Sequence, residues 1–178
     1  MNGAPGVGKS ALADRYGRDH ALALVVDVDD LRRHLGRWET IEESKTTARD
    51  LAVALAAAHL GRGFDVVIPQ YVGRREFVAR LHRVAADAGT AFVEVLVTDD
   101  DAAIVERFRA RRAMLANAGV RHPEADLADA DVDASIRAAA EALRRDAAAY
   151  DVAVVDGGAG IEAAYRALCD VLARIASA

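Results

Sequence analysis

The sequence predicts an α/β fold in which one parallel sheet carries helices on both faces. Two observations predict it. Short apolar runs alternate with helical patterns along the whole chain, and the chain opens on a glycine-rich motif of the kind that leads into a helix. The runs expected to form buried strands are residues 21–26, 64–68, 91–97 and 152–155. With 178 residues and no repeat or linker, we expect a single domain over residues 1–178.

The opening motif is a complete match to the phosphate-binding loop G-x-x-x-x-G-K-[ST]. It consists of Gly3, Ala4, Pro5, Gly6, Val7, Gly8, Lys9 and Ser10. Glycines let backbone N–H groups converge on a polyphosphate, and the following helix directs its positive end at the same anion. We expect Lys9 to reach the β- and γ-phosphates of ATP and the Ser10 hydroxyl to ligate Mg²⁺. The alternative is a glycine-rich turn that only caps a helix.

Only Met1 and Asn2 precede this loop, whereas a strand takes about five residues. Two explanations are open. Either Met1 is an internal residue of a longer reading frame, which we favour, or the sheet lacks its usual central strand. A sheet without that strand would have a gap or an unpaired edge beside its own site.

Carboxylates gather after the first apolar run, at Asp27, Asp29 and Asp30. The crevice beyond the carboxyl ends of parallel strands is where α/β folds bind ligands. We expect at least one of the three acids to cap the next helix, which leaves others for chemistry. After the second run the neutral Gln70 stands where many such proteins carry an acid that holds Mg²⁺ through water. Magnesium would then depend on Ser10, the nucleotide and the earlier acids.

Arg107 and Arg111 share a helix face, and neither has an acid three or four positions away. Stacked like charges cost a few tenths of a kcal/mol, so we expect an anion from elsewhere. A bound phosphate is the favoured anion, and acids from another segment are the alternative. The following stretch, residues 117–133, contains glycine and proline without periodicity and is predicted to be a mobile flap.

For each of three further features, a structural role is an alternative to a functional one. Trp38 is either a stacking surface for a substrate or a core anchor, and the glycine-rich turn at Gly157 either approaches an adenine ring or only joins a strand to a helix. The helix expected over residues 46–60 has Leu51 and Leu55 on one face. His59 on its apolar side is expected to be packed rather than a ligand.

Composition narrows the class of protein. The net charge of −5 argues against broad binding to nucleic acid or to an anionic membrane. The single Cys169 allows no internal disulfide, and no run approaches the roughly 18 apolar residues of a membrane span. With no basic-then-apolar leader at its start, the chain is expected to be soluble and cytoplasmic.

Together these motifs resemble the nucleoside-monophosphate-kinase-like branch of phosphate-loop NTPases. Within it the chain is similar to the group of zeta toxins, chloramphenicol phosphotransferases and polynucleotide kinases. The loop carries most of the resemblance. The run Asp29-Asp30-Leu31-Arg32 matches the D-D-x-R pattern of polynucleotide kinases, and Arg107 and Arg111 match an arginine-bearing lid.

The resemblance implies a three-layer fold with sheet order 2-3-1-4-5 and a short lid over about residues 107–133. It implies that Asp29 is the general base, with Asp27 as an alternative base or a metal-site residue, and that Arg32 points at the acceptor. Arg107 and Arg111 would balance charge on the transferred phosphoryl group.

The predicted function is an ATP-dependent kinase, with Mg²⁺, that phosphorylates a hydroxyl of a small molecule. An ATPase or nucleotide-dependent switch without a second substrate is one alternative, and a polynucleotide 5′-hydroxyl kinase is another. The last alternative is that the chain as given is a truncated, inactive product. The acceptor and the oligomeric state stay open.

Overall fold

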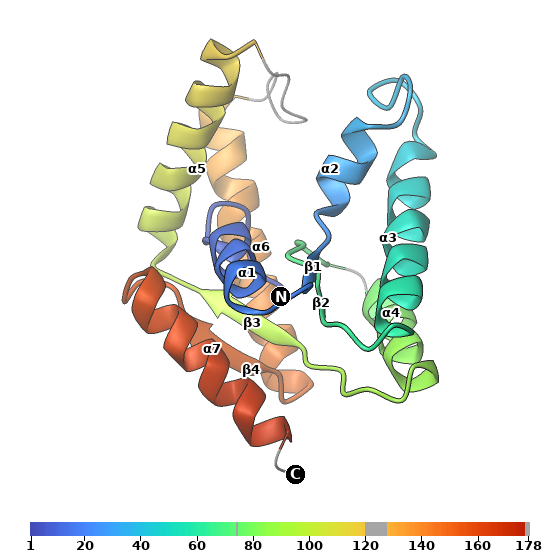
Figure 1. The fold of residues 1–178 in the computed structure, drawn as a ribbon. Helices are drawn as coiled ribbons and strands as arrows, with labels where there is room; N and C mark the ends of the chain where they lie inside the picture. Colours follow the sequence, from blue (N-terminus) through green and yellow to red (C-terminus); the bar gives the residue numbers. More distant parts are fainter. Residues whose placement is uncertain (74, 120–127, 177–178) are drawn as a thin grey trace.

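Helices and short strands alternate along the chain in the computed structural model, which describes residues 1–73, 75–119 and 128–176 (Figure 1). The elements are α1 (Lys9–Asp19), β1 (Leu24–Val25), α2 (Val28–Arg33), α3 (Ser44–Leu60), β2 (Val66–Val67), α4 (Arg75–Asp87), β3 (Val95–Thr98), α5 (Asp101–Asn117), α6 (Asp129–Ala149), β4 (Ala153–Asp156) and α7 (Ile161–Ala176). Each strand lies within or overlaps an apolar run predicted to form one.

The strands pair in two parallel halves. β1 pairs with β2, with Leu24 opposite Val66, and β3 pairs with β4, with Val95 opposite Ala153. Parallel pairing is what the intervening helices require, because each crossover returns the chain to the same end of the sheet. The α/β fold class and the parallel sheet are therefore confirmed.

The first two residues join the two halves. Asn2 forms a parallel bridge with Leu96 of β3, through N–H···O bonds of 2.7 Å to Val95 and 2.9 Å from Val97. On the opposite side, the Met1 amino group donates to the Ile68 carbonyl at 3.0 Å. The N-terminus thus lies in the middle of the fold (Figure 1).

This placement yields the order β1, β2, Met1–Asn2, β3, β4. When the loop's own strand is counted first, that is the expected order 2-3-1-4-5. Residues 1 and 2 occupy the position of the central strand that was expected to be missing. Two residues are too few to run the length of the sheet.

An apolar cavity of about 340 Å³ borders these two residues. Its walls include Val66 and Val67 of β2, Val93 and Val95 at β3, and Leu168 and Leu172 of α7. Because both half-sheets contribute walls, the cavity lies between β2 and β3 on the N-terminal side of Met1.

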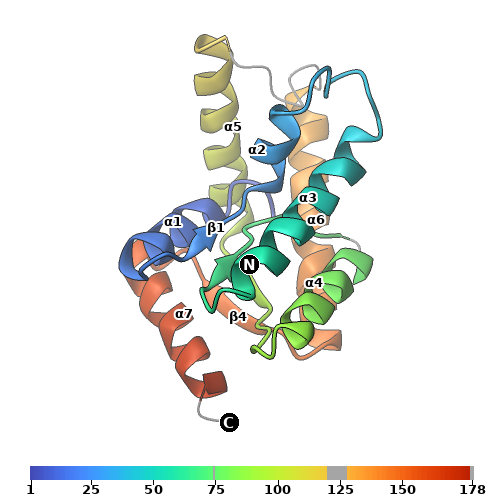
Figure 2. The ribbon, with the colours of Figure 1, turned by 45° about the vertical axis from the view of Figure 1, so that its right-hand side comes forward.

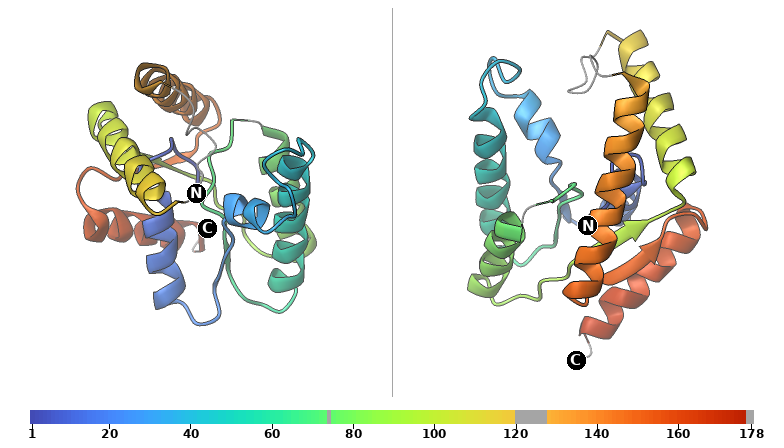
Figure 3. Two further views of the ribbon diagram at one scale, coloured as in Figure 1. Left: turned by 90° about the horizontal axis from the view of Figure 1, so that it is seen from above. Right: turned by 180° about the vertical axis from the view of Figure 1, so that it is seen from behind.

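Helices cover both faces of the β3–β4 half. Val95 and Val97 belong to the main core with α1 and α7, whereas Leu96 packs with Leu143 and Ala147 of α6. Successive strand residues point to opposite faces, so these contacts place α6 on the face away from α1 and α7. Figure 2 shows α1 beside α7, and Figure 3 shows α6 on the other side.

The α3 helix packs through small residues. Its buried positions are Ser44, Ala48, Ala52 and Ala56, whereas Leu51 and Leu55 are each 41% exposed. The sequence interpretation placed Leu51 and Leu55 on the apolar face, and for packing this is wrong. Small side chains let α3 approach α2, α4 and β2 closely, and all three contact it.

The predicted lid is largely helical where it is described. Arg107 to Asn117 belong to α5, and residues 129–133 are the start of α6 rather than an irregular flap. Two ion pairs join these helices, between Arg109 and Asp133 at 2.6 Å and between Arg112 and Asp129 at 3.0 Å. Residues 120–127 lie outside the described residues, so the mobility of the lid stays a prediction. Across the described ranges, none of the helices has the length and apolar character needed to cross a bilayer.

Candidate active site

The phosphate-binding loop turns sharply into α1 at its glycines. Gly8 is the residue before the helix and has φ 101°, and Gly6 has φ 87°, a region that residues with a Cβ rarely adopt. A Cβ at Gly6 would also lie 2.6 Å from the Ile104 carbonyl oxygen. The loop therefore needs glycine at Gly6 for backbone conformation and for its packing against α5.

Lys9 is only 8% exposed and is held by the loop itself. Its Nζ donates to the carbonyl oxygens of Gly3 at 2.9 Å and Ala4 at 3.0 Å. Burial, followed by the nearby charge of Arg111, lowers the pKa of Lys9 from 10.5 to about 8, while Asp29 and Asp27 act in the opposite direction. An anion beside Lys9 would favour its charged form.

One cavity of about 520 Å³ brings together the polar residues predicted to act in catalysis or metal binding. These residues are Lys9, Ser10, Asp27, Asp29, Arg32, Arg107 and Arg111. They come from α1, α2 and α5 and from the end of β1, segments up to about a hundred residues apart in the chain. Of the rest of the loop, Pro5, Gly6 and Gly8 also line the cavity.

Asp27 caps α2. One oxygen, Oδ1, accepts from the backbone N–H groups of Asp29 at 2.8 Å and Asp30 at 3.1 Å. This confirms that one acid of the group is a helix cap. The Asp29 side chain is exposed to the cavity and, among the described residues, makes no hydrogen bond, whereas Asp30 pairs with Arg33.

The Arg32 guanidinium is fixed by neutral oxygen atoms. Its Nε donates to Ser44 Oγ at 2.9 Å and its Nη2 to the Trp38 carbonyl at 3.3 Å. The same guanidinium lies 5.0 Å from the centre of the Trp38 ring. Trp38 does not line the cavity or join the described core clusters, so it supports Arg32 instead of filling either role expected for it.

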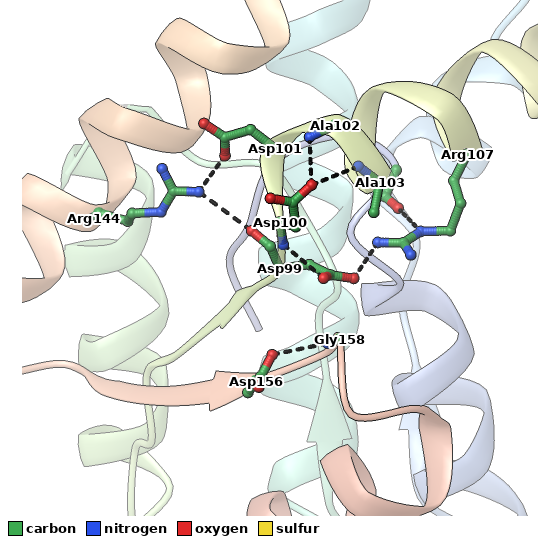
Figure 4. A network of polar contacts seen from close by, with 10 residues as sticks. Asp99, Asp100, Asp101, Ala102, Ala103, Arg107, Arg144, Asp156 and Gly158 are labelled. Carbon is green, nitrogen blue, oxygen red and sulfur yellow. Dashed lines mark hydrogen bonds and ion pairs between the residues drawn. The ribbon is translucent and has the colours of Figure 1, made fainter.

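Arg107 links the phosphate-binding loop to the end of β3. Its Nε donates to the Gly6 carbonyl at 3.0 Å, and its Nη2 pairs with Asp99, whose side chain is 5% exposed (Figure 4). The sequence predicted either a bound phosphate or an acid from another segment as the partner of these arginines. For Arg107 the partner is an acid from another segment, Asp99. Arg111 lines the same cavity and forms no ion pair within the described part of the chain.

The three acids after β3 have separate roles in Figure 4. Asp99 pairs with Arg107, Asp100 caps α5 through the N–H groups of Ala102 and Ala103, and Asp101 pairs with Arg144 of α6. This network anchors the start of α5, and therefore Arg107 and Arg111, to the sheet.

A comparison with protein-family models shows the family to which the chain belongs. The family model described as AAA domain matches residues 1–130. The chain belongs to this family. The match begins at the phosphate-binding loop and extends past Arg107 and Arg111, so it contains all the predicted site residues except Gly157. No curated protein sequence matches the chain.

Two solved structures share the fold of this AAA domain over nearly its whole length. A gluconokinase from Sinorhizobium meliloti 1021 aligns with a TM-score of 0.62 and 16% identity, covering 99% of this chain and 91% of its own. The tunicamycin resistance protein of Deinococcus radiodurans aligns with a TM-score of 0.54 and 16% identity, covering 96% and 92%. The resemblance to phosphate-loop kinase-like NTPases is therefore confirmed at the level of family and fold.

Gly157 lies apart from the cavity lining. Its N–H donates to the Thr98 carbonyl at 2.7 Å, and a Cβ there would lie 3.1 Å from that oxygen and 3.2 Å from the Val7 carbonyl oxygen. The structure gives Gly157 a packing role between the sheet and the loop, and the adenine contact stays a prediction.

Oxygen donors suited to Mg²⁺ line the cavity of this AAA domain at Ser10 and Asp27. One Asp27 oxygen serves the helix cap, which leaves the other for a ligand. The described residues contain no cluster of three metal-binding side chains. These donors fit a magnesium ion that takes its other ligands from nucleotide and water.

Sequence reasoning missed Arg49 and the role of Asn2. Arg49 lines the cavity one helical turn after Lys45, and that i, i+4 spacing on a helix was the available signal. Asn2 is 7% exposed, and its side chain bonds to Gly3 and to both backbone groups of Val72. No local pattern indicates these bonds, because their partner Val72 lies 70 residues away.

Proposed function

We propose that this AAA domain is an ATP-dependent kinase that transfers the γ-phosphoryl group to a hydroxyl of a small molecule. The observation that carries the proposal is the shared cavity. Lys9 and Ser10 of the phosphate-binding loop open into the same space as the exposed carboxylate of Asp29. An exposed carboxylate that faces the loop is the group that can accept the proton of an acceptor hydroxyl.

Each polar group then has a chemical role. The loop N–H groups and Lys9 bind the β- and γ-phosphates, and the positive charge of Arg111 stabilises the negative charge on the oxygens of the transferred group. Asp29 accepts the proton of the acceptor hydroxyl, whose oxygen forms a bond to the γ-phosphorus as the bond to the ADP oxygen breaks. The products are ADP and the phosphorylated acceptor. Mg²⁺, held through Ser10 and Asp27, would neutralise the phosphate oxygens.

Arg107 has a positioning role in this proposal. In the structure it holds the Gly6 carbonyl and pairs with Asp99. By fixing the loop against α5, it keeps the N–H groups in the conformation that a triphosphate needs. We propose that this activity takes place in the cytoplasm, which supplies both ATP and small hydroxyl compounds.

The test measures transfer from labelled ATP across a panel of hydroxyl compounds, with wild type, Asp29→Asn and Asp30→Asn. Loss of a general base lowers kcat by about 10²- to 10⁴-fold, so Asp29→Asn is expected to lose transfer while binding ATP normally. Asp30→Asn is the matched control, because Asp30 pairs with Arg33 and does not line the cavity.

Transfer that is unchanged in Asp29→Asn would remove Asp29 as the base. ATP hydrolysis at the same rate with and without every acceptor would instead favour an ATPase. Labelling of oligonucleotide 5′ ends in preference to small molecules would favour the polynucleotide kinase alternative.

A further inference from the structure

The wall of the cavity beside Asp29 is rich in positive charge. It is built from α2 and α3, which pack against each other (Figure 1). From α2 it receives Arg32 and Arg33, and from α3 it receives Lys45, Ala48 and Arg49. Lys45 and Arg49 are one turn apart on α3, and Ala48 beside them is fully buried.

Two of these four cations are neutralised by neighbours outside the cavity. Arg33 pairs with Asp30, and Lys45 pairs with Glu42 at 2.9 Å. Neither acid lines the cavity. Arg33 and Lys45 are also exposed, so water screens their charge.

Neither Arg32 nor Arg49 forms an ion pair with a described carboxylate, although the charge of Glu42, the partner of Lys45, acts on Arg32 at longer range. Both arginines are half-buried. The partners of Arg32 are the Ser44 hydroxyl, the Trp38 carbonyl and the Trp38 ring, none of which carries a negative charge. Arg49 forms no ion pair with any described residue. The cavity's own carboxylates are Asp27, already used as a helix cap, and Asp29.

A half-buried guanidinium that lines a cavity and has no carboxylate partner is available to an anionic ligand. Arg32 in particular is held in place before any ligand binds, and a planar guanidinium fork suits carboxylate, phosphate or sulfate oxygens. Such a site would fix one end of an acceptor while its hydroxyl reaches Asp29.

We propose that the acceptor carries an anionic group that binds Arg49 and Arg32. The substrate class is therefore a small hydroxyl compound with a carboxylate, phosphate or sulfate at its other end. This inference rests on the proposed kinase activity and narrows it. The transfer step is unchanged: the acceptor oxygen bonds to the γ-phosphorus, ADP leaves, and Asp29 takes the hydroxyl proton.

The experiment uses matched acceptors, namely a neutral polyol, the monocarboxylic acid of the same length, and the corresponding phosphate and sulfate esters. Each is assayed with wild type, Arg49→Gln and Arg62→Gln. Arg62 is an exposed residue beyond the end of α3 that does not line the cavity, so its substitution changes net charge equally. Comparison of the three anionic acceptors identifies which anion the site takes.

The expected result is a KM lower for one anionic acceptor than for the polyol. In Arg49→Gln that KM should rise by about 10- to 100-fold, the usual effect of losing a charge-assisted hydrogen bond. We expect kcat, the KM for ATP, the KM for the polyol and all values of Arg62→Gln to stay within about twofold. Equal use of neutral and anionic acceptors, or a KM change for ATP in Arg49→Gln, would overturn the proposal.

Direct binding separates this inference from the kinase proposal. Calorimetric titration of the same compounds into protein loaded with a non-hydrolysable ATP analogue needs no turnover. If no compound is phosphorylated yet an anion binds wild type and binds Arg49→Gln at least tenfold more weakly, the kinase proposal fails and the anion site stands. If phosphorylation occurs and no such difference in binding is found, the anion site fails alone.

Discussion

The side chain of Asn2 is bonded to both backbone groups of Val72, with Nδ2 donating to the Val72 carbonyl and Oδ1 accepting from its N–H, each at 3.0 Å. Oδ1 also accepts from the Gly3 N–H at 2.9 Å. One buried amide thus ties the start of the phosphate-binding loop to the segment after β2. That segment carries Gln70 and Tyr71, which line the cavity.

Replacement of Asn2 by alanine is expected to lower the free energy of unfolding by about 2–4 kcal/mol. The substitution removes the partner of the buried Gly3 N–H and of the half-buried Val72 N–H, and a buried unsatisfied group costs about 1–3 kcal/mol. Urea denaturation measures the change. Asn117→Ala, at the exposed end of α5, is the control and should change stability by less than about 1 kcal/mol. Equal stabilities of the two variants would contradict the assigned role of Asn2.

Nucleotide affinity should fall at alkaline pH because of Lys9. The pKa of Lys9 in the free protein is lowered to about 8, and bound phosphates favour the charged form, so binding above that pH must take up a proton. We expect the affinity for ATP to fall by up to about tenfold per pH unit above pH 8. Calorimetry at pH 8.5 in buffers of different ionisation enthalpy should detect the proton uptake.

Arg111→Gln should move this alkaline limb to higher pH, because the charge of Arg111 is the second cause of the lowered pKa of Lys9. The affinity at pH 7 can fall as well, so the informative quantity is the midpoint of the pH profile. Arg109→Gln is the matched control, since Arg109 is paired with Asp133 on α6. A midpoint that stays unchanged in Arg111→Gln would show that burial alone sets the pKa.

Arg107→Ala is expected to lower the free energy of unfolding by about 1–3 kcal/mol, because it leaves the carboxylate of Asp99 buried without its partner. The arginine is 47% exposed, which keeps the loss below that of a fully buried pair. Asp99→Asn and the double variant complete a thermodynamic cycle. A coupling of at least about 0.5 kcal/mol is expected from denaturation curves, and additive effects would rule out the pair as a stabilising contact.

The Met1 amino group should make stability depend on pH. Its burial, followed by the charge of Lys9, lowers its pKa from 8.0 to about 6 in the folded chain. Between pH 6 and 8 the unfolded chain binds a proton that the folded chain does not, so stability rises with pH across this window. The gain is about 2–3 kcal/mol, fully lost below pH 6.

The control for this effect is the same chain with an acetylated or extended N-terminus. A few β-branched residues ahead of Met1 would remove the charge and extend into the 340 Å³ cavity between the half-sheets. We expect such a variant to have a higher Tm than the free amine at pH 6 and a smaller advantage at pH 8. A constant difference across this range would contradict the lowered pKa.

Local patterns were sufficient for much of the fold and the site. Each of the four apolar runs contains or overlaps a strand, the motif from Gly3 to Ser10 forms the loop, and two of the three acids after the first run, Asp27 and Asp29, line the cavity. These features depend on residues close together in the chain, whose spacing is visible in the sequence. The prediction that Leu51 and Leu55 mark the packed face of α3 was wrong, because an amphipathic pattern does not show which face meets a neighbour. Here the face with small alanines packs, since small side chains allow the closer approach.

By itself, the sequence determined the phosphate-binding loop, the alternation of strands and helices, and the acids and arginines that share the site. Only the tertiary structure decided that Met1 and Asn2 stand between two half-sheets, that Arg107 is paired with Asp99 while Arg111 has no ion pair among the described residues, and that Arg49 lines the same cavity as Asp29. The physical reason is that charge compensation and burial depend on groups brought together across the chain. The type of a side chain determines which groups it can bind, and the fold determines whether another part of the chain already provides such a group.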